Sequence, residues 1–267
     1  MQYIVITSTK GGVGKTTIAM NMSILLGMGG RRVLILDMGE GGVSSRLLNP
    51  EDIRASLAEF ILGKASIVTS IAVPDIARIE LRGEEIDMDL FVIPPSSPST
   101  NPITLHTALS KAGADGLRRL WDNLSVLRDY IDVVIVDLPT HYPVFNPIFA
   151  LLDRSDRVLV VSTPDYACID ALSKFYYETL SKLLSTTPVV VLNMCYSKDV
   201  EIRYTKELKG VFTDSPIFTL PWDPSVRVPA SPHNIKYILS RVSDRYLSSL
   251  VEITLYLLRG GGSELER

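Results

Sequence analysis

Two lysines bracket a glycine-rich segment near the start of the chain, KGGVGKTT at residues 10–17. The segment follows an apolar run, Tyr3–Ile6, which predicts a strand leading into a loop. Its spacing fits the phosphate-loop pattern G-x-x-x-x-G-K-[ST] loosely, because Thr9 stands at the first glycine position while Lys15 and Thr16 fill the last two. Glycines let such a loop curl until its N–H groups point at phosphate oxygens. The segment therefore predicts binding of a nucleoside triphosphate.

The pattern assigns a role to the polar side chains of the loop. Lys15 would reach the β- and γ-phosphates, and the Thr16 hydroxyl would bind Mg²⁺. The helix predicted to begin near Lys15 adds the positive end of its dipole. Lys10 is one lysine more than such a loop needs, and its charge suits a phosphate held by a neighbouring subunit. The residues expected to touch the nucleotide here are Gly11, Gly12, Val13, Gly14, Lys15, Thr16 and Thr17.

Aspartates end two of the apolar runs. Asp37 closes Val33–Asp37, and Asp137 closes Val133–Asp137. An acid at the end of a buried strand beside a phosphate loop supports the Mg²⁺ ion from behind. The simpler alternative for each aspartate is a turn or helix cap. We predict metal support for Asp137 and an active-site role for Asp37.

Short apolar, β-branched runs alternate with amphipathic stretches along the chain. This alternation predicts an α/β fold of parallel strands joined by crossover helices. The predicted strands are Tyr3–Thr7, Val33–Asp37, Leu90–Ile93, Val133–Asp137, Val158–Ser162, Val189–Asn193 and Ile217–Leu220. The predicted helices are one that follows the loop and ends near Gly29–Gly30, and then Ile53–Leu62, Asp115–Tyr130, Asp170–Leu184, Val200–Leu208 and Ile235–Leu258.

Composition narrows the class of protein further. A chain of 267 residues favours one large domain, here residues 1–259, followed by a flexible tail at 260–267 that begins with three glycines. The net charge of −3 argues against a basic nucleic-acid binder as a whole, although a local basic patch is compatible with it. The two cysteines form no CxxC pair, and no apolar run approaches the ~18 residues of a membrane span. We expect a cytoplasmic protein.

The motifs taken together resemble the ParA/MinD family of P-loop ATPases, whose phosphate loop carries a leading lysine. The resemblance covers nearly the whole chain and rests on segments in the order and spacing of the family. Beside KGGVGKTT and the two strand-ending aspartates, these are Leu90–Ser96, Ser155–Pro164, Val189–Asn193 and Leu220–Ala230. The resemblance implies a single-domain P-loop NTPase with a mostly parallel, twisted sheet of about seven strands and helices on both faces.

Particular residues inherit roles through this resemblance. Lys10 matches the signature lysine that reaches across a nucleotide-sandwich homodimer to the phosphates of the partner subunit. Asn193 matches an asparagine that contacts adenine, and Pro221–Asp223 match a loop lining the base pocket. Asp137 matches the acid that leads into the second switch region. The implied cofactors are ATP, ADP and Mg²⁺, with Thr16 and Asp137 on the metal side.

One departure from the family pattern concerns hydrolysis. Family members usually read D-x-D after the second strand, and the second aspartate positions the attacking water. Here the sequence reads Asp37-Met38-Gly39, so that carboxylate is absent. Glu40 follows and is long enough to replace it, while the plain alternative is a solvated loop residue. Binding of nucleotide is therefore a safer expectation than fast turnover.

The resemblance leads to one main functional hypothesis. It is an ATP-dependent dimerising switch of the ParA type, an ATPase that binds non-specific DNA during plasmid or chromosome partition and responds to an adaptor protein. The alternatives are a MinD-like ATPase acting on a membrane or protein surface, a nucleotide-binding scaffold with little hydrolysis, and, last, a metabolic enzyme of the same fold. Candidate DNA contacts are Arg203, Lys206, Lys209, Arg227, Lys236, Arg241 and Arg245.

Two further features have plain interpretations. The apolar stripe of the last predicted helix lacks the many basic residues of a membrane-surface helix, so we expect it to pack on the sheet. His141 follows Asp137 closely but is expected to be a surface residue.

Overall fold

The computed structural model describes residues 1–39, 42–75, 78–81, 84–98, 104–140, 149–226 and 242–259. Its centre is a seven-stranded sheet in the order β5-β2-β6-β1-β7-β8-β9, in which every neighbouring pair is parallel. The strands are β1 (Gln2–Thr7), β2 (Val33–Asp37), β5 (Leu90–Ile93), β6 (Val133–Asp137), β7 (Arg157–Ser162), β8 (Val189–Cys195) and β9 (Ile217–Pro221). The predicted α/β fold is confirmed, including its seven parallel strands.

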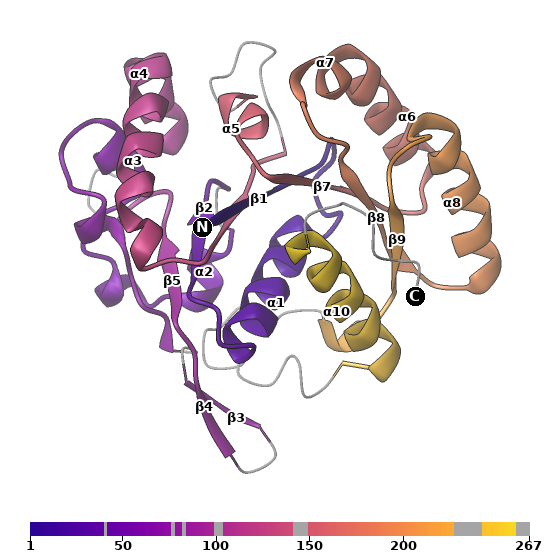
Figure 1. The fold of residues 1–267 in the computed structure, drawn as a ribbon, viewed down its shortest axis with the longest axis horizontal. Coiled ribbons are helices and arrows are strands. Elements are labelled where there is room, and N and C mark those ends of the chain that lie inside the picture. The colour runs from indigo at the N-terminus through magenta and orange to yellow at the C-terminus, as the bar shows by residue number, and fades with distance from the viewer. Residues whose placement is uncertain are drawn as a thin grey trace.

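Helices cover both faces of this sheet (Figure 1). One face carries α1 (Lys15–Met28) and α10 (Asp244–Leu258), which lie side by side in Figure 1 and contact one another. The remaining helices are α2 (Ser44–Leu47), α3 (Leu57–Ile61), α4 (Leu105–Val126), α5 (Phe149–Asp153), α6 (Tyr166–Phe175), α7 (Ser181–Leu183) and α8 (Lys198–Val211). Short 3₁₀ turns occupy Pro50–Asp52, Val68–Ser70, Leu127–Asp129 and Pro224–Val226, and a π-helical turn occupies Tyr176–Leu180.

Alternation along the buried strands divides the core into two layers. In β1, Ile4 and Ile6 belong to the layer under α1 and α10, whereas Val5 belongs to the layer under α3, α4, α6 and α8. Successive side chains of a strand point to opposite faces, so a continuous apolar run fills both layers. The prediction that the last helix packs on the sheet is confirmed, because Leu250, Ile253 and Leu257 are fully buried.

Several predicted helix ends are wrong, and capping explains most of the differences. The range Ile53–Leu62 is too long, because Ser56 caps α3 and forms a capping box with Glu59. Three other helices start earlier than predicted, where a side-chain oxygen accepts a hydrogen bond from the first turn. These caps are Thr104 on α4, Asp165 on α6 and Ser197 on α8. The last helix begins after Ser243, and residues 235–241 of that prediction lie outside the described residues.

A two-stranded antiparallel sheet was missed from the sequence. It pairs β3 (Arg78–Leu81) with β4 (Glu84–Asp87) and extends away from the main sheet beside β5 (Figure 1). Just before it, Ala72 forms an antiparallel bridge with Val92 of β5. This bridge lies on the outer edge of the main sheet, because β2 occupies the other side of β5.

Candidate nucleotide-binding site

The predicted phosphate loop connects β1 to α1, at the carboxyl edge of the sheet where open α/β folds bind ligands. Gly14 is the N-cap of α1 and has φ 99°, a left-handed conformation that favours glycine. A Cβ at this position would lie 2.2 Å from the Asn193 side-chain nitrogen. Both backbone and space therefore require glycine at the point where the loop enters the helix.

Lys15 is held between two hydroxyl groups. Its Nζ donates to Ser8 Oγ at 2.9 Å and to Thr140 Oγ1 at 3.0 Å. The residue is only 7% exposed, and this burial lowers the pKa of Lys15. Ser8 and Thr140 were not identified from the sequence, although each follows a strand at the edge that carries the loop. The structure thus adds both hydroxyls to the site.

Thr16 and Asp137, which were both predicted on the metal side, contact one another. Thr16 Oγ1 donates to Asp137 Oδ2 at 2.7 Å. The other carboxylate oxygen, Oδ1, is buried and has no hydrogen-bond partner within the described parts of the chain. Burial and the nearby Asp37 carboxylate raise the pKa of Asp137 to about 7. An unpaired buried acceptor beside a threonine hydroxyl fits a hydrated Mg²⁺, which takes few protein ligands and keeps several waters.

Asp37 forms a turn cap at the end of β2. Its carboxylate is fully buried and accepts hydrogen bonds from the Gly39 N–H at 3.0 Å and from the Ser44 N–H and hydroxyl, each at 2.7 Å. A Cβ at Gly42 would lie 2.5 Å from the same carboxylate. These contacts match the cap alternative for Asp37 and fasten the segment after β2 to the end of the strand. The active-site role stays a prediction.

The opposite side of the loop borders an open pocket of about 440 Å³. Two of its aromatic side chains are well exposed, Trp222 at 50% and Tyr196 at 69%. Exposed tryptophan is uncommon unless a ligand or partner covers it, because its large apolar surface is otherwise hydrated. The pocket is lined by Gly11, Gly12, Val13, Thr163, Pro164, Cys168, Met194, Tyr196 and Trp222.

Irregular backbone positions the pocket wall. The pairing of β8 with β9 shifts register between Leu192 and Cys195, and Met194 inside this bulge has φ 62°. The Trp222 N–H then donates to the Cys195 carbonyl at 2.9 Å, which fixes the start of the loop after β9. Bulges that redirect side chains, and non-glycine residues at positive φ, occur preferentially beside functional sites.

The residues expected around the base lie on this same side. Asn193 donates its side-chain N–H to the Val13 carbonyl at 2.8 Å and so supports the loop directly. Pro221 ends β9 opposite Cys195. The Asp223 carboxylate accepts from the backbone N–H groups of Ser225 and Ser243, at 2.9 and 2.6 Å. Contact of any of these residues with adenine stays a prediction.

The Lys10 side chain has a different partner from the hydroxyls that hold Lys15. Its Nζ is 3.6 Å from an Asp165 carboxylate oxygen, in the connection between β7 and α6. Asp165 also caps α6, since its carboxylate accepts from the Cys168 N–H at 2.9 Å. Both side chains are exposed at this pair, so the attraction is weak. The Lys15 side chain is therefore buried, whereas the Lys10 side chain lies at the surface.

Part of the predicted site lies outside the described residues, namely Glu40, His141, Arg227, Lys236, Arg241 and the tail 260–267. Gly39 is described, and a Cβ built there would lie 3.5 Å from the Asp37 carboxylate, an ordinary contact. A Cβ at the position of the missing aspartate is therefore sterically allowed.

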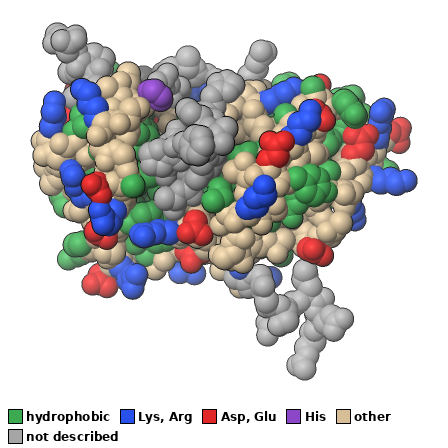
Figure 2. All heavy atoms as spheres, turned by 90° about the horizontal axis from the view of Figure 1, so that it is seen from above, with side chains coloured by type: hydrophobic (Ala, Val, Ile, Leu, Met, Phe, Trp, Pro, Cys, Tyr) green, Lys and Arg blue, Asp and Glu red, His purple; other side chains and the backbone are tan. Residues whose placement is uncertain are grey.

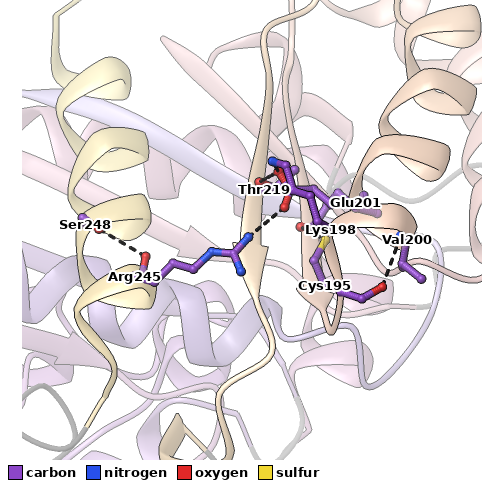
Figure 3. Close-up of polar contacts among 9 residues, drawn as sticks. Cys195, Lys198, Val200, Glu201, Thr219, Arg245 and Ser248 are labelled. Carbon is purple, nitrogen blue, oxygen red and sulfur yellow. Dashed lines mark hydrogen bonds and ion pairs between the residues drawn. The ribbon is translucent and has the colours of Figure 1, made fainter.

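Two of the candidate DNA-binding side chains form ion pairs with glutamates. Arg203 pairs with Glu207 at 3.5 Å on α8. Arg245 reaches from α10 to Glu201 of α8 at 2.8 Å, and Glu201 also accepts from Lys198 and Thr219 (Figure 3). Basic and acidic side chains are interspersed on the face shown in Figure 2. Among the described residues, no helix is long and apolar enough to span a membrane.

A parallel sheet with a glycine-rich loop, a buried lysine and a threonine–aspartate pair defines a P-loop nucleotide-binding protein. The model of the family described as "AAA domain" matches residues 1–188, more than half of the chain. The chain belongs to this family and, within it, to the ParA/MinD group of P-loop ATPases.

Individual relatives agree with this placement. The sporulation initiation inhibitor protein Soj of Bacillus subtilis is 25% identical over 272 residues, which cover 94% of this chain and 98% of Soj. The antiactivator FleN of Pseudomonas aeruginosa is 27% identical over 244 residues, covering 85% of this chain and 76% of FleN. Among solved structures, the cell division protein MinD of Aquifex aeolicus superimposes over 100% of both chains with a TM-score of 0.73 and 18% identity.

Proposed function

We propose that this protein is an ATP-dependent dimerising switch of the ParA type that acts in plasmid or chromosome partition. The proposal rests on the different surroundings of the two lysines of the loop. Lys15 is buried and bonded to two hydroxyls near Thr16 and Asp137, whereas the Lys10 side chain lies on the outer surface beside Asp165. A surface lysine next to a phosphate loop suits phosphates that belong to a second copy.

The chain supplies the parts that a Mg–ATP complex needs. Thr16 would ligate Mg²⁺ and Asp137 would support its waters, while Lys15 would bind phosphate oxygens. The bound metal would neutralise charge on the phosphates during transfer to water. A lysine from a second copy would add positive charge in the manner of an arginine finger. Nucleotide binding and dimerisation are thereby linked.

Relatives support a role in partition or positioning. Besides Soj, the chromosome partitioning protein ParA of Caulobacter vibrioides is 27% identical over 118 residues, covering 43% of this chain and 44% of that protein. Another structural neighbour is the ATP complex of a McdA variant from Cyanothece, which superimposes over 100% of this chain and 99% of that one with a TM-score of 0.70 and 20% identity. We extend binding of ATP to this chain.

Sedimentation and binding measurements test the switch. We expect ATP with Mg²⁺, but not ADP, to convert monomer to dimer, and the dimer to bind DNA of any sequence with an affinity that falls steeply as salt rises. A dimer that ignores DNA and binds anionic liposomes instead would favour the MinD-like alternative. A protein that stays monomeric with ATP would contradict the proposal.

Gly39 provides a specific reason to consider slow hydrolysis. The water-positioning aspartate of the family is missing there, and a Cβ at this position makes only ordinary contacts. We expect Gly39→Asp to raise ATP turnover by about tenfold or more, because a positioned carboxylate contributes on that scale. Gly39→Asn is the matched control without the negative charge. Equal turnover in both variants would show that the position has no catalytic effect.

Glu40→Ala tests the replacement directly. If Glu40 supplies the missing carboxylate, its loss should lower phosphate release while nucleotide binding persists. If the wild type shows no detectable ATP turnover with or without DNA, the scaffold alternative is favoured. Turnover that Lys15→Ala abolishes would exclude it.

A further inference from the structure

The number of N–H donors on Lys15 limits how many groups it can bind at once. A lysine ammonium carries three N–H donors. Two of them are directed at Ser8 Oγ and Thr140 Oγ1, at 2.9 and 3.0 Å. One donor is left for a phosphate. ADP needs this one donor for a β-phosphate oxygen, so Lys15 can bind ADP and keep both hydroxyl partners. ATP needs Lys15 to donate to a β- and a γ-phosphate oxygen, so one of the hydroxyls must lose its hydrogen bond to Lys15.

The two hydroxyls differ in how firmly they are held. Ser8 is almost fully buried, and its hydroxyl also donates to the Lys10 carbonyl at 2.9 Å, which fixes its rotamer inside the loop. Thr140 is half-buried, lies three residues beyond the end of β6, and is joined to the loop through Lys15. Breaking the Lys15–Thr140 bond is therefore the less costly exchange.

We propose that Thr140 is a γ-phosphate sensor: ATP takes its place on Lys15, whereas ADP leaves the Lys15–Thr140 bond intact. The inference rests on the nucleotide binding proposed above and adds a residue that discriminates between the two nucleotides. The bond competes with the γ-phosphate for the same ammonium group, so it weakens ATP binding selectively. The segment that follows Asp137 is thereby linked to the third phosphate.

Valine and serine at position 140 separate the hydroxyl from the side-chain shape. Thr140→Val keeps the β-branched volume and removes the acceptor, while Thr140→Ser keeps the acceptor. We expect Thr140→Val to bind the non-hydrolysable analogue AMP-PNP about 10- to 100-fold more tightly, the range of one hydrogen bond to a charged group, with ADP affinity unchanged. Thr140→Ser should resemble the wild type for both nucleotides.

Calorimetric titrations at low and high protein concentration give these constants and show whether dimerisation contributes. Weaker AMP-PNP binding by Thr140→Val would mean that Thr140 contacts the nucleotide, and equal changes for both nucleotides would mean that it does not discriminate; either result overturns the proposal. No change would also overturn it. A wild type that binds neither nucleotide would instead contradict the proposed function.

A second readout tests the bond without nucleotide. In protein labelled with ¹⁵N at lysine Nζ, the buried Lys15 ammonium should give a resonance that shifts in Thr140→Val and not in Thr140→Ser. In the wild type, AMP-PNP should alter this resonance more than ADP does. A Lys15 resonance that is identical in the two variants would show that the hydroxyl is not its partner.

Discussion

The phosphate loop separates two regions of opposite character. On the side of β6 and β2, Lys15, Thr16 and Asp137 are largely buried and bonded to one another or to hydroxyls. On the side of β7, β8 and β9, Trp222 and Tyr196 stand exposed around a pocket. The first region is therefore organised by the chain itself. The second presents apolar surface that a base or another protein would cover.

The largest effect should come from the buried region. Lys15→Ala removes the only ammonium group bonded within it in the described structure. We expect affinity for ADP to fall by about 100-fold, because the β-phosphate loses a charge-assisted hydrogen bond from the one N–H donor that Ser8 and Thr140 leave over. Titration with a fluorescent ADP analogue measures this. Affinity within a few-fold of the wild type would show that backbone N–H groups alone bind the phosphates, and the contrast between the regions would fail.

Lys10→Ala tests the exposed region with a matched change of charge. We expect the variant to bind ATP nearly as well as the wild type but to lose ATP-induced dimerisation, by about 10- to 100-fold in the dimer dissociation constant, since a charge-assisted contact across subunits is removed. Light scattering with Mg–ATP gives the answer. A normal dimer would refute a role for Lys10 across the interface.

The next largest effect should be on the pH dependence of folding stability, through Asp137 in the buried region. Because burial and Asp37 raise the pKa of Asp137 to about 7 from 3.8, the folded state holds the proton more tightly than the unfolded state. Its contribution to stability is therefore greatest below about pH 4 and is lost as pH rises to about 7. We expect Asp137→Asn to flatten the decline in Tm between these values. Each kcal/mol moves Tm by about 2–4 °C in domains of roughly this size.

The slope is the decisive readout for Asp137, because the variant also loses the attraction between Asp137 and Lys15. Thermal unfolding of both proteins without nucleotide, at matched ionic strength, measures it. Equal slopes of Tm against pH in the wild type and Asp137→Asn between pH 4 and 7 would contradict the raised pKa.

The smallest effect concerns the pocket wall. Trp222→Ala should weaken ADP binding by about 3- to 10-fold if the base stacks on the indole. The chain has one other tryptophan, Trp121, which is 7% exposed and packs edge-on against Tyr3. A fluorescence change on adding ADP should therefore disappear in Trp222→Phe. A change that requires ATP and high protein concentration would show that a second copy, rather than the base, covers Trp222.

The sequence was most informative where one residue type is required locally. Gly14 has a positive φ and no room for a Cβ, and β-branched runs mark every strand of the main sheet. It was least informative for contacts between distant segments. Thr140 lies 125 residues from Lys15, and only the pairing of β1 with β6 brings them together. A threonine after a strand carries no signal of its own, so this contact could not be predicted. The family resemblance indicated a pocket wall at Pro221–Asp223, but nothing in the sequence pointed to Tyr196.

Helix ends illustrate the same limit on a smaller scale. Apolar periodicity located the helices, but Ser56, Thr104 and Ser197 determine where they begin. Serine and threonine are common in loops as well as at helix caps, so apolar spacing alone does not locate the first helical residue. The β3–β4 hairpin was missed because its strands are short and rich in charge.

The bridge between Ala72 and Val92 bears on how two copies can associate. Both outward-facing backbone groups of Val92 are bonded to Ala72, at 2.8 and 2.9 Å, and the Leu90 N–H donates to the Met88 carbonyl. An added strand would need these groups, so the β5 edge is protected against sheet extension and edge-to-edge aggregation. Assembly by strand addition is thereby disfavoured at the β5 edge, which is consistent with the proposed dimer that forms through side-chain surfaces around Lys10.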